Sequence, residues 1–347
     1  MDKRQADVIK ITKGLCIFFV VLGHTMIPSI RNESESVYTI WTIIYLFHMP
    51  VFFAVSGILF ELNRDRYRQE PVRFLKNKFR LLIVPYITIS IMVYLILIVL
   101  TKILGLSAMI TQYVHEINSI HDVFFEIATY ENHVAQHLWF VLVLFLIFCV
   151  NTIFRGVNQK FICVLLTIGP VFALPMLKMV FEVPDIPNYF LFELPFFMLG
   201  RLIAQNKKIL ERVTTFNFSP IVFAVLVWLY ISFINGVDIL PSPFRWIFLF
   251  IMRCMGIMMV FSISALTERS SRAKRAMQFL EEKSYPIYLL HQPFIVSGGA
   301  GVLYAIGIPI PVIILLITFL GLLIPLIIDK MFKNIKFYRV FVLGGRK

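Results

Sequence analysis

Two ionisable residues, Lys13 and His24, stand eleven positions apart in an otherwise apolar stretch. At about 100° and 1.5 Å per residue, a helix would place both side chains on one face, about 16 Å apart along its axis. A neutral imidazole can act as a general base near pH 7, and a lysine can hold an anion. An ionisable group inside a membrane span is by default a candidate functional site, although a histidine hydrogen-bonded within a helix bundle would also fit this pattern.

Three more polar side chains fall inside apolar stretches, at His48, Glu193 and Arg253. His48 lies just before Pro50, which can kink a membrane helix, so it is either a hydrogen-bonded residue at a packing kink or a second group facing the cavity of His24. Arg253 has no acidic neighbour in the sequence and must reach the membrane surface, pair across helices or face a cavity, which we favour. Glu193 lies near the expected outer boundary, where it could bind sugar hydroxyls or stay hydrated.

A polar stripe marks another apolar stretch near the end of the chain. Tyr288, His291 and Gln292 have the spacing i, i+3 and i+4, which places them on one face of a helix. Because the rest of that helix is apolar, we expect this face to point into a bundle. Tyr288 and His291 therefore join His48, Glu193 and Arg253 as candidates to line a cavity or bind an acceptor.

The elements that must position these residues are membrane helices. Hydrophobic residues make up 59% of the 347 residues and charged residues only 15%, which is far more apolar than a soluble protein. We expect an all-α polytopic domain over residues 1–347, with the first span retained and no appended soluble domain. About ten spans of the required length are predicted, near residues 14–31, 37–60, 80–104, 136–154, 161–181, 188–206, 218–235, 245–267, 285–305 and 308–329.

The net charge of +13 is mainly a signal of membrane topology. Of the 33 lysines and arginines, 28 fall in segments on one side of the ten expected spans. The positive-inside rule then places both termini in the cytoplasm and removes the reason to expect nucleic acid as a partner. The densest basic segment, residues 64–80, is typical of a solvated cytoplasmic face, of attraction to anionic lipid headgroups, or of binding to a phosphorylated ligand.

A metal site is not expected from this sequence. His133 and His137 have helical spacing, but no carboxylate motif accompanies them, and residues 105–135 are better interpreted as an exterior amphipathic segment. His137 with Trp139 is typical of an aromatic anchor at the membrane interface. The four cysteines all lie in apolar segments and indicate neither disulfides nor metal ligation.

Five motifs in order resemble the acyltransferase 3 family of integral membrane acyltransferases, especially its fucose 4-O-acetylase-like branch. The five motifs occur in this order between residues 13 and 293, a region that covers nearly all of the chain. As a set they are specific to this family. The motifs are Lys13-Gly14 with residues 20–24, Phe47-His48-Met49-Pro50 with Ser56-Gly57, Arg80-Leu81-Leu82-Ile83-Val84-Pro85-Tyr86, Leu138-Trp139-Phe140, and residues 284–293.

The resemblance implies ten helices and transfer of an acetyl or other short acyl group from cytoplasmic acyl-CoA to a hydroxyl of an envelope glycan. The family's basic residue and histidine, separated by ten intervening residues, fall on Lys13 and His24. Its basic pair before the third helix matches only loosely, with Arg73 and Lys76 at the right spacing and Arg80 nearer the motif that follows. We expect these four cations to hold the donor, and no tightly bound cofactor.

The leading hypothesis is an O-acyltransferase of a bacterial cytoplasmic membrane, in which His24 is the general base that activates the acceptor hydroxyl. A transient acyl-imidazole on His24 is the less favoured mechanism. The acceptor would be a glycan or a lipid-linked sugar, the partners would include membrane lipids, and small glycine-rich faces would permit self-association. A transporter or flippase for such a sugar is the alternative, although the sequence lacks the repeats that many transporters show.

Overall fold

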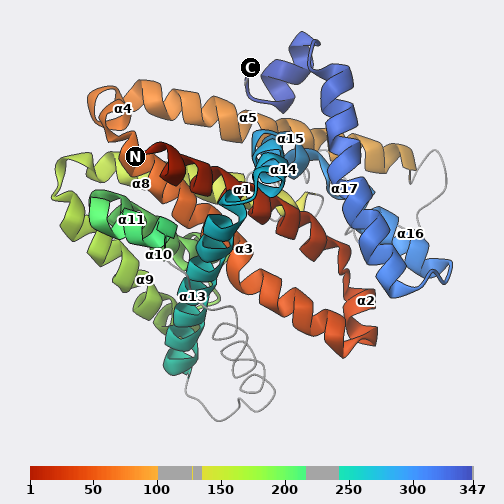
Figure 1. The fold of residues 1–347 in the computed structure, drawn as a ribbon, viewed down its shortest axis with the longest axis horizontal. Coiled ribbons are helices and arrows are strands. Elements are labelled where there is room, and N and C mark those ends of the chain that lie inside the picture. The colour runs from red at the N-terminus through yellow and green to blue at the C-terminus, as the bar shows by residue number, and fades with distance from the viewer. Residues whose placement is uncertain (101–126, 128–134, 216–241, 346–347) are drawn as a thin grey trace.

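The computed structural model describes residues 1–100, 127, 135–215 and 242–345, and it is all-α, with 89% of these described residues helical. Figure 1 shows the helices as one bundle with both chain ends in the upper part of the view. The described helices are α1 (Lys3–Thr25), α2 (Pro28–Glu33), α3 (Glu35–Leu62), α4 (Arg64–Gln69), α5 (Pro71–Ile98), η2 (Gln136–Leu138), α8 (Trp139–Ile153), η3 (Phe154–Gly156), α9 (Gln159–Val180), α10 (Asp185–Gln205), α11 (Lys207–Thr215), α13 (Ser242–Glu268), α14 (Ser271–Glu282), α15 (Ser284–Leu290), η5 (Phe294–Gly298), α16 (Gly299–Ala305), α17 (Ile310–Phe332) and η6 (Tyr338–Val342).

Six of the described helices are long and apolar enough to cross a membrane. They are residues 35–62, 71–98, 136–156, 159–180, 246–268 and 310–332. The expected span at 218–235, the end of the span at 80–104 and the segment 105–135, apart from residues 127 and 135, lie outside the described residues. A multi-pass membrane protein is confirmed, while the count of ten spans and the orientation of the termini stay predictions.

The expected span at 285–305 is not one continuous helix. It is divided into α15, the π-helical turn η5 and α16, and a cis peptide bond joins Gln292 to Pro293 between the first two. His291 stands at this break, directly after α15. In contrast, α3 continues unbroken through Pro50, so the expected kink beside His48 does not end the helix.

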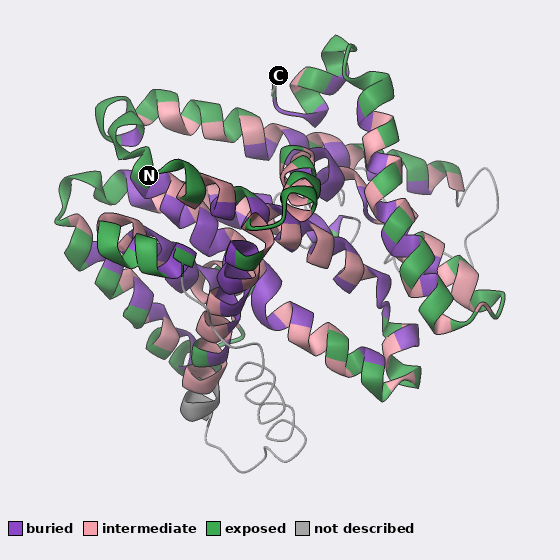
Figure 2. Ribbon diagram, viewed as in Figure 1, coloured by how far each residue is buried: buried purple, intermediate pink, exposed green. Residues whose placement is uncertain are grey.

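The centre of the bundle is formed by α1 and α3. Helix α1 packs against α3, α13, α14, α15 and α17, and α3 also packs closely along α10. Two glycines permit the second contact, because a Cβ on Gly57 would come within 1.9 Å of the Phe197 carbonyl oxygen and one on Gly200 within 1.9 Å of the Ala54 carbonyl oxygen. In the most apolar part of each membrane-length helix, the buried share is 72% for α3 and only 28% for α17. Figure 2 shows more exposed residues along α17 than along α3.

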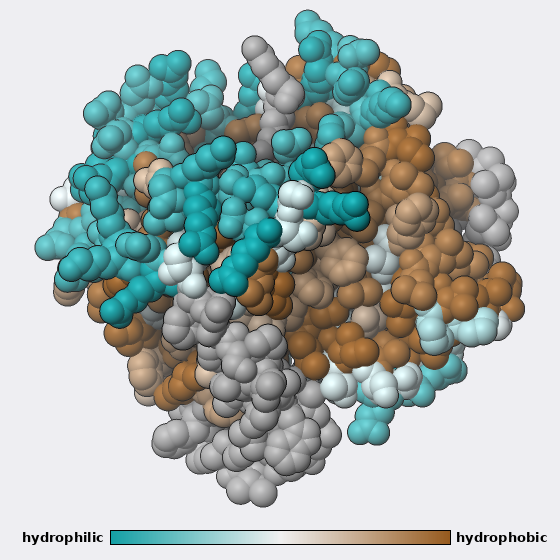
Figure 3. Space-filling view, viewed as in Figure 1, coloured by the Kyte–Doolittle hydropathy of each residue, from teal (hydrophilic) through white to brown (hydrophobic). Residues whose placement is uncertain are grey.

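One end of the bundle is strongly charged, and we call it the basic face. In Figure 3 hydrophilic side chains gather where Figure 1 shows α4, α11, α14 and both termini, while hydrophobic side chains cover α16 and α17. Exposed apolar residues such as Leu315 and Phe319 on α17, which are 73% and 60% exposed, fit contact with lipid tails. The polar face and apolar belt match a protein that sits across a membrane.

Candidate active site

Four histidines from separate segments meet inside the bundle, and we call them the histidine cluster. His24 lies in the last turn of α1, His48 in the middle of α3, His137 in η2, and His291 directly after α15. The ring centroids of His24 and His291 are 5.3 Å apart, and those of His137 and His291 are 5.4 Å apart. The fold therefore brings together His24, His48 and His291, as the sequence predicted, and adds His137.

Tyr45 connects two members of the histidine cluster. It lies one helical turn before His48 on α3, and the centroids of these two rings are 4.6 Å apart. Its hydroxyl oxygen is 3.4 Å from Nδ1 of His24. The contact fixes the orientation of the His24 ring and leaves Nε2 as the nitrogen that does not face Tyr45.

His291 has one satisfied nitrogen and one that is not. Its Nδ1 lies 2.8 Å from the Tyr288 carbonyl oxygen and 3.0 Å from that of Ile287. Because carbonyls only accept hydrogen bonds, the neutral ring must carry its proton on Nδ1. Nε2 is then an acceptor, and it is buried without a hydrogen-bond partner in the described part of the chain. Tyr288 itself donates to the His137 carbonyl oxygen at 2.6 Å.

The four histidines differ in how far a ligand could reach them. His48, His137 and His291 are buried, with exposed fractions of 3%, 7% and 0%. His24 is only partly buried. A base must come within hydrogen-bond reach of the group that it deprotonates, so His24 is the cluster member best placed to meet a substrate.

Glu193 and Arg253 form an ion pair between α10 and α13, with Arg253 Nη1 donating to Glu193 Oε1 at 3.3 Å. The guanidinium also lies over the Phe192 ring, 3.9 Å from its centroid. Glu193 is only 3% exposed, so the alternative that its side chain simply stays hydrated was wrong. Its second oxygen, Oε2, is buried and has no hydrogen-bond partner among the described residues. Arg253 pairs across helices and lies close enough to His48 for an electrostatic interaction.

Lys13 forms an ion pair with Glu281 of α14, the amphipathic helix that packs along α1. A second ion pair on this helix joins Lys274 to Asp7 at 2.6 Å, and Lys274 also reaches Glu268 at 3.1 Å. The hydrogen bond from Lys274 lowers the pKa of Asp7 below its ordinary value of 3.8. Lys13 is thus a neutralised cation, about 16 Å from His24 along α1.

The other three expected donor-binding cations stand apart from the histidine cluster. Arg73 is exposed and pairs with Glu70 at 2.9 Å, and Lys76 is exposed on the same helix, α5. Arg80 is exposed as well and lies against Gly345 near the end of the chain. All three lie in the first ten residues of α5, so they form a cationic strip and do not converge with Lys13 on one enclosed pocket.

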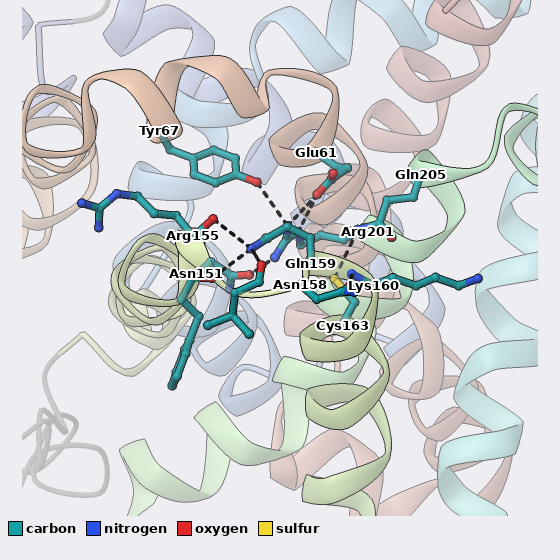
Figure 4. A network of polar contacts seen from close by, with 12 residues as sticks. Glu61, Tyr67, Asn151, Arg155, Asn158, Gln159, Lys160, Cys163, Arg201 and Gln205 are labelled. Carbon is teal, nitrogen blue, oxygen red and sulfur yellow. Dashed lines mark hydrogen bonds and ion pairs between the residues drawn. The ribbon is translucent and has the colours of Figure 1, made fainter.

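A second buried polar site, which we call the Arg201 cluster, lies where α3, α8 and α10 meet the basic face (Figure 4). Arg201 is fully buried, and all three of its nitrogens donate hydrogen bonds. Nε and Nη2 reach Glu61 Oε2 at 2.8 and 2.6 Å, Nη1 reaches Asn151, and Nη2 also reaches Tyr67 and Gln159 at 3.1 and 2.6 Å. Sequence reasoning had counted Arg201 only as one of many cytoplasmic cations.

His137 and Tyr45 are the site residues that sequence reasoning missed. His137 is buried beside His291, a contact that its interpretation as part of an interfacial anchor did not include. The sequence held one signal for each residue. His137 lies directly before an apolar helix, and Tyr45 lies one helical turn before His48. In the described part of the chain no group of three or more histidine, cysteine or acidic residues is arranged to hold a metal ion.

Comparison with family models gives one match, to an acyltransferase domain over residues 7–330, which includes Lys13 and the whole histidine cluster. This chain belongs to the acyltransferase 3 family. It is therefore a membrane acyltransferase. No curated protein and no solved structure matches this acyltransferase. The match does not select a branch of the family, so the fucose 4-O-acetylase-like resemblance stays a prediction.

Proposed function

We propose that this acyltransferase moves an acetyl or other short acyl group from cytoplasmic acyl-CoA to a hydroxyl of an envelope glycan or lipid-linked sugar. The observation that carries the proposal is the position of His24. It is the partly accessible member of a buried histidine cluster, and it lies within a family match for acyl transfer. A bacterial cytoplasmic membrane is the proposed location.

In this mechanism Nε2 of His24 is the general base. In the tautomer that this mechanism needs, Nδ1 keeps its proton and donates a hydrogen bond to the Tyr45 hydroxyl oxygen, 3.4 Å away, so that Nε2 holds the free electron pair. Nε2 takes the proton of the acceptor hydroxyl as its oxygen attacks the thioester carbonyl carbon. The carbon–sulfur bond then breaks, and the leaving sulfur takes the proton from the imidazolium. The products are an ester and free CoA, and the histidine returns to its neutral form.

The remaining polar groups around the cluster suit the acceptor. His291 Nε2 and Glu193 Oε2 are buried acceptors that lack a partner in the described residues, and each could bind a substrate hydroxyl. His48 and Tyr288 would shape the cavity, and the charge of Arg253 would favour the developing oxyanion. Buried hydrogen-bond acceptors without donors fit a substrate that carries many hydroxyl groups, such as a sugar.

The donor would enter from the basic face. Lys13, Arg73, Lys76 and Arg80 are the proposed phosphate contacts, and a phosphate arriving at Lys13 would have to replace Glu281. The distance of about 16 Å between Lys13 and His24 suits a donor whose charged end stays at the surface while its acyl thioester reaches the cluster. The family match favours this transferase over the transporter alternative.

The test supplies membranes containing the chain with radiolabelled acetyl-CoA and follows the label into extracted glycan and glycolipid. The proposal expects label in one of these fractions, which also identifies the acceptor class. Butyryl-CoA in a parallel reaction measures the preference for a short chain. Movement of a lipid-linked sugar across the membrane with no acyl label on any fraction, despite bound acetyl-CoA, would contradict the proposal and support transport.

A further inference from the structure

A pocket with a volume of about 850 Å³ opens on the basic face, away from the histidine cluster. It lies between the end of α3, the short helix α4, the turn from η3 into α9, and the junction of α10 with α11. This volume is within the range of small-molecule sites. Neither the proposed catalytic step nor the expected donor cations use this pocket.

The pocket is lined by an excess of positive charge. Arg64 and Arg68, one turn apart on α4, and Lys160 at the start of α9 are all exposed to solvent. Glu61 is the one acidic residue among the described residues that line it, and its carboxylate is already bound by Arg201. Side-chain amides complete the polar lining, from Asn158, Gln159, Gln205 and Asn206. Arg64, Arg68 and Lys160 have no ion-pair partner among the described residues. Three such cations around amide donors favour an anion with several acceptor oxygens.

The Arg201 cluster forms the floor of this pocket. Glu61 and Gln159 line the pocket and bind the fully buried Arg201 behind them, as Figure 4 shows. His48 lies thirteen residues before Glu61 on α3, about 20 Å away along the helix axis. Because a fully buried guanidinium fills the space at the floor, a ligand in this pocket would not reach the histidine cluster. The pocket is a separate site.

The surroundings of the pocket favour a ligand with an apolar part. Val157 and Ile209 line the pocket and are each 43% exposed. Beside them, Ile153 and Phe161 are 69% and 60% exposed on the membrane-length segments that lead away from the basic face. Cations next to exposed apolar side chains at the edge of a membrane span are the arrangement that binds an anionic headgroup and its acyl chains.

We propose that this pocket binds the phosphate headgroup of an anionic phospholipid. The phosphate would lie among Arg64, Arg68 and Lys160, and the acyl chains would run along the exposed apolar face of α9. Such a lipid would tie α4, α9 and α11 together at the basic face. The same phosphate chemistry occurs in soluble ligands such as CoA or inorganic pyrophosphate, so the experiment must separate these sources.

The experiment measures thermal midpoints of the full chain in nanodiscs of phosphatidylcholine alone and with added phosphatidylglycerol, and counts retained phosphatidylglycerol by native mass spectrometry. The test variant R64Q/R68Q/K160Q removes the three pocket cations. The control variant K330Q/K333Q/K336Q removes the same charge from exposed lysines in the last turn of α17 and just after it. Each basic side chain near an anionic surface contributes about fivefold in affinity, so the test variant should bind phosphatidylglycerol roughly 100-fold more weakly.

A steric pair of variants gives a test that leaves the charge unchanged. Gly156 lines the pocket and Gly169 does not, yet a Cβ on either would meet no atom within 4 Å. Gly156→Leu should therefore abolish phosphatidylglycerol retention while Gly169→Leu keeps it, with both variants folded. Equal retention by R64Q/R68Q/K160Q and K330Q/K333Q/K336Q would overturn the proposal, because the lipid would then respond to general surface charge. Protection by CoA or pyrophosphate, with no response to phosphatidylglycerol, would overturn the lipid source.

Discussion

The Arg201 cluster and the histidine cluster are both buried polar sites in one apolar bundle, but their hydrogen bonding differs. All three nitrogens of Arg201 donate to protein acceptors, and the partner carboxylate of Glu61 accepts two of these bonds. In and beside the histidine cluster, His291 Nε2 and Glu193 Oε2 lack partners in the described residues, and His24 stays partly accessible. In the Arg201 cluster the protein's own groups complete the hydrogen bonds of the guanidinium, whereas in and beside the histidine cluster buried acceptors have no donor among the described residues.

This difference indicates different roles for the two sites. A buried charge with a complete set of partners stabilises one arrangement of helices and has no capacity left for a ligand. A buried acceptor without a partner costs free energy in the empty protein, and a substrate that donates to it recovers that cost. The Arg201 cluster is therefore structural, and the histidine cluster is the place where chemistry is expected.

The largest expected effect on stability comes from removing Arg201 from the Arg201 cluster. Arg201→Met leaves the buried carboxylate of Glu61 without its cation, which should lower the free energy of unfolding by about 3–5 kcal/mol. Thermal unfolding in detergent measures the loss. The double variant Glu61→Gln with Arg201→Met removes the stranded charge and should recover part of it. An Arg201→Met protein as stable as wild type would contradict the structural role.

A smaller loss is expected from the glycine contact that lies beside the Arg201 cluster. Gly57→Ala places a Cβ 1.9 Å from the Phe197 carbonyl oxygen, so α3 and α10 must separate, at a cost of about 1–3 kcal/mol. Gly169→Ala is the matched control, because its Cβ meets no atom within 4 Å. The control should be neutral or slightly stabilising, since alanine favours a helix more than glycine does. Equal melting of the two variants would show that the close contact is absent.

A substitution in the histidine cluster should lower activity and leave stability unchanged, whereas the substitutions at the Arg201 cluster lower stability. His291→Leu removes the buried Nε2 that lacks a partner in the described residues and puts an apolar side chain of similar size in its place, so the thermal midpoint should stay the same or rise. Acyl transfer should slow by about 10- to 100-fold, because one acceptor for the substrate hydroxyl is lost. The rate of acyl transfer and the thermal midpoint should be measured on the same preparation. Strong destabilisation with unchanged transfer per folded molecule would make His291 a structural residue.

The smallest effect belongs to the partly buried ion pair between Lys274 of α14 and Asp7. Lys274 holds the pKa of Asp7 below 3.8, so this pair adds stability above pH 3.8 and loses it as the pH falls through the lowered pKa. Asp7→Asn should cost about 0.5 kcal/mol or less at pH 6, since Lys274 keeps Glu268 as a partner. The stability curves of variant and wild type should converge below pH 3.8. A difference in the free energy of unfolding between wild type and Asp7→Asn that grows as the pH falls would contradict a stabilising ion pair between Asp7 and Lys274.

Much of the fold could be predicted from the sequence, because the apolar runs and the placement of basic residues follow directly from membrane physics. The long helices through residues 35–62, 159–180 and 310–332 lie where hydropathy predicted them. The division of residues 285–305 was not predicted. An apolar run shows that a segment can be buried, but it does not show where the segment changes from one kind of helix to another.

The candidate site was only partly predictable, for a related reason. His24 and His48 were recognised because each is a polar residue in an apolar stretch, and His291 because it shares a polar helix face with Tyr288 and Gln292. His137 and Arg201 stand at the ends of apolar stretches, where polar residues are ordinary, and burial alone distinguishes them. The pairing of Lys13 with Glu281, 268 residues away, depends on how α14 packs along α1 and has no local signal.

The most direct test of the account compares acyl transfer from radiolabelled acetyl-CoA by wild type and by His24→Ala, each at equal folded concentration. The account predicts that the variant loses about 10²- to 10⁴-fold in transfer, because its general base is gone, while its thermal midpoint and binding of acetyl-CoA are kept. Transfer by His24→Ala at the wild-type rate would contradict the central claim and would move the search for the base to His291.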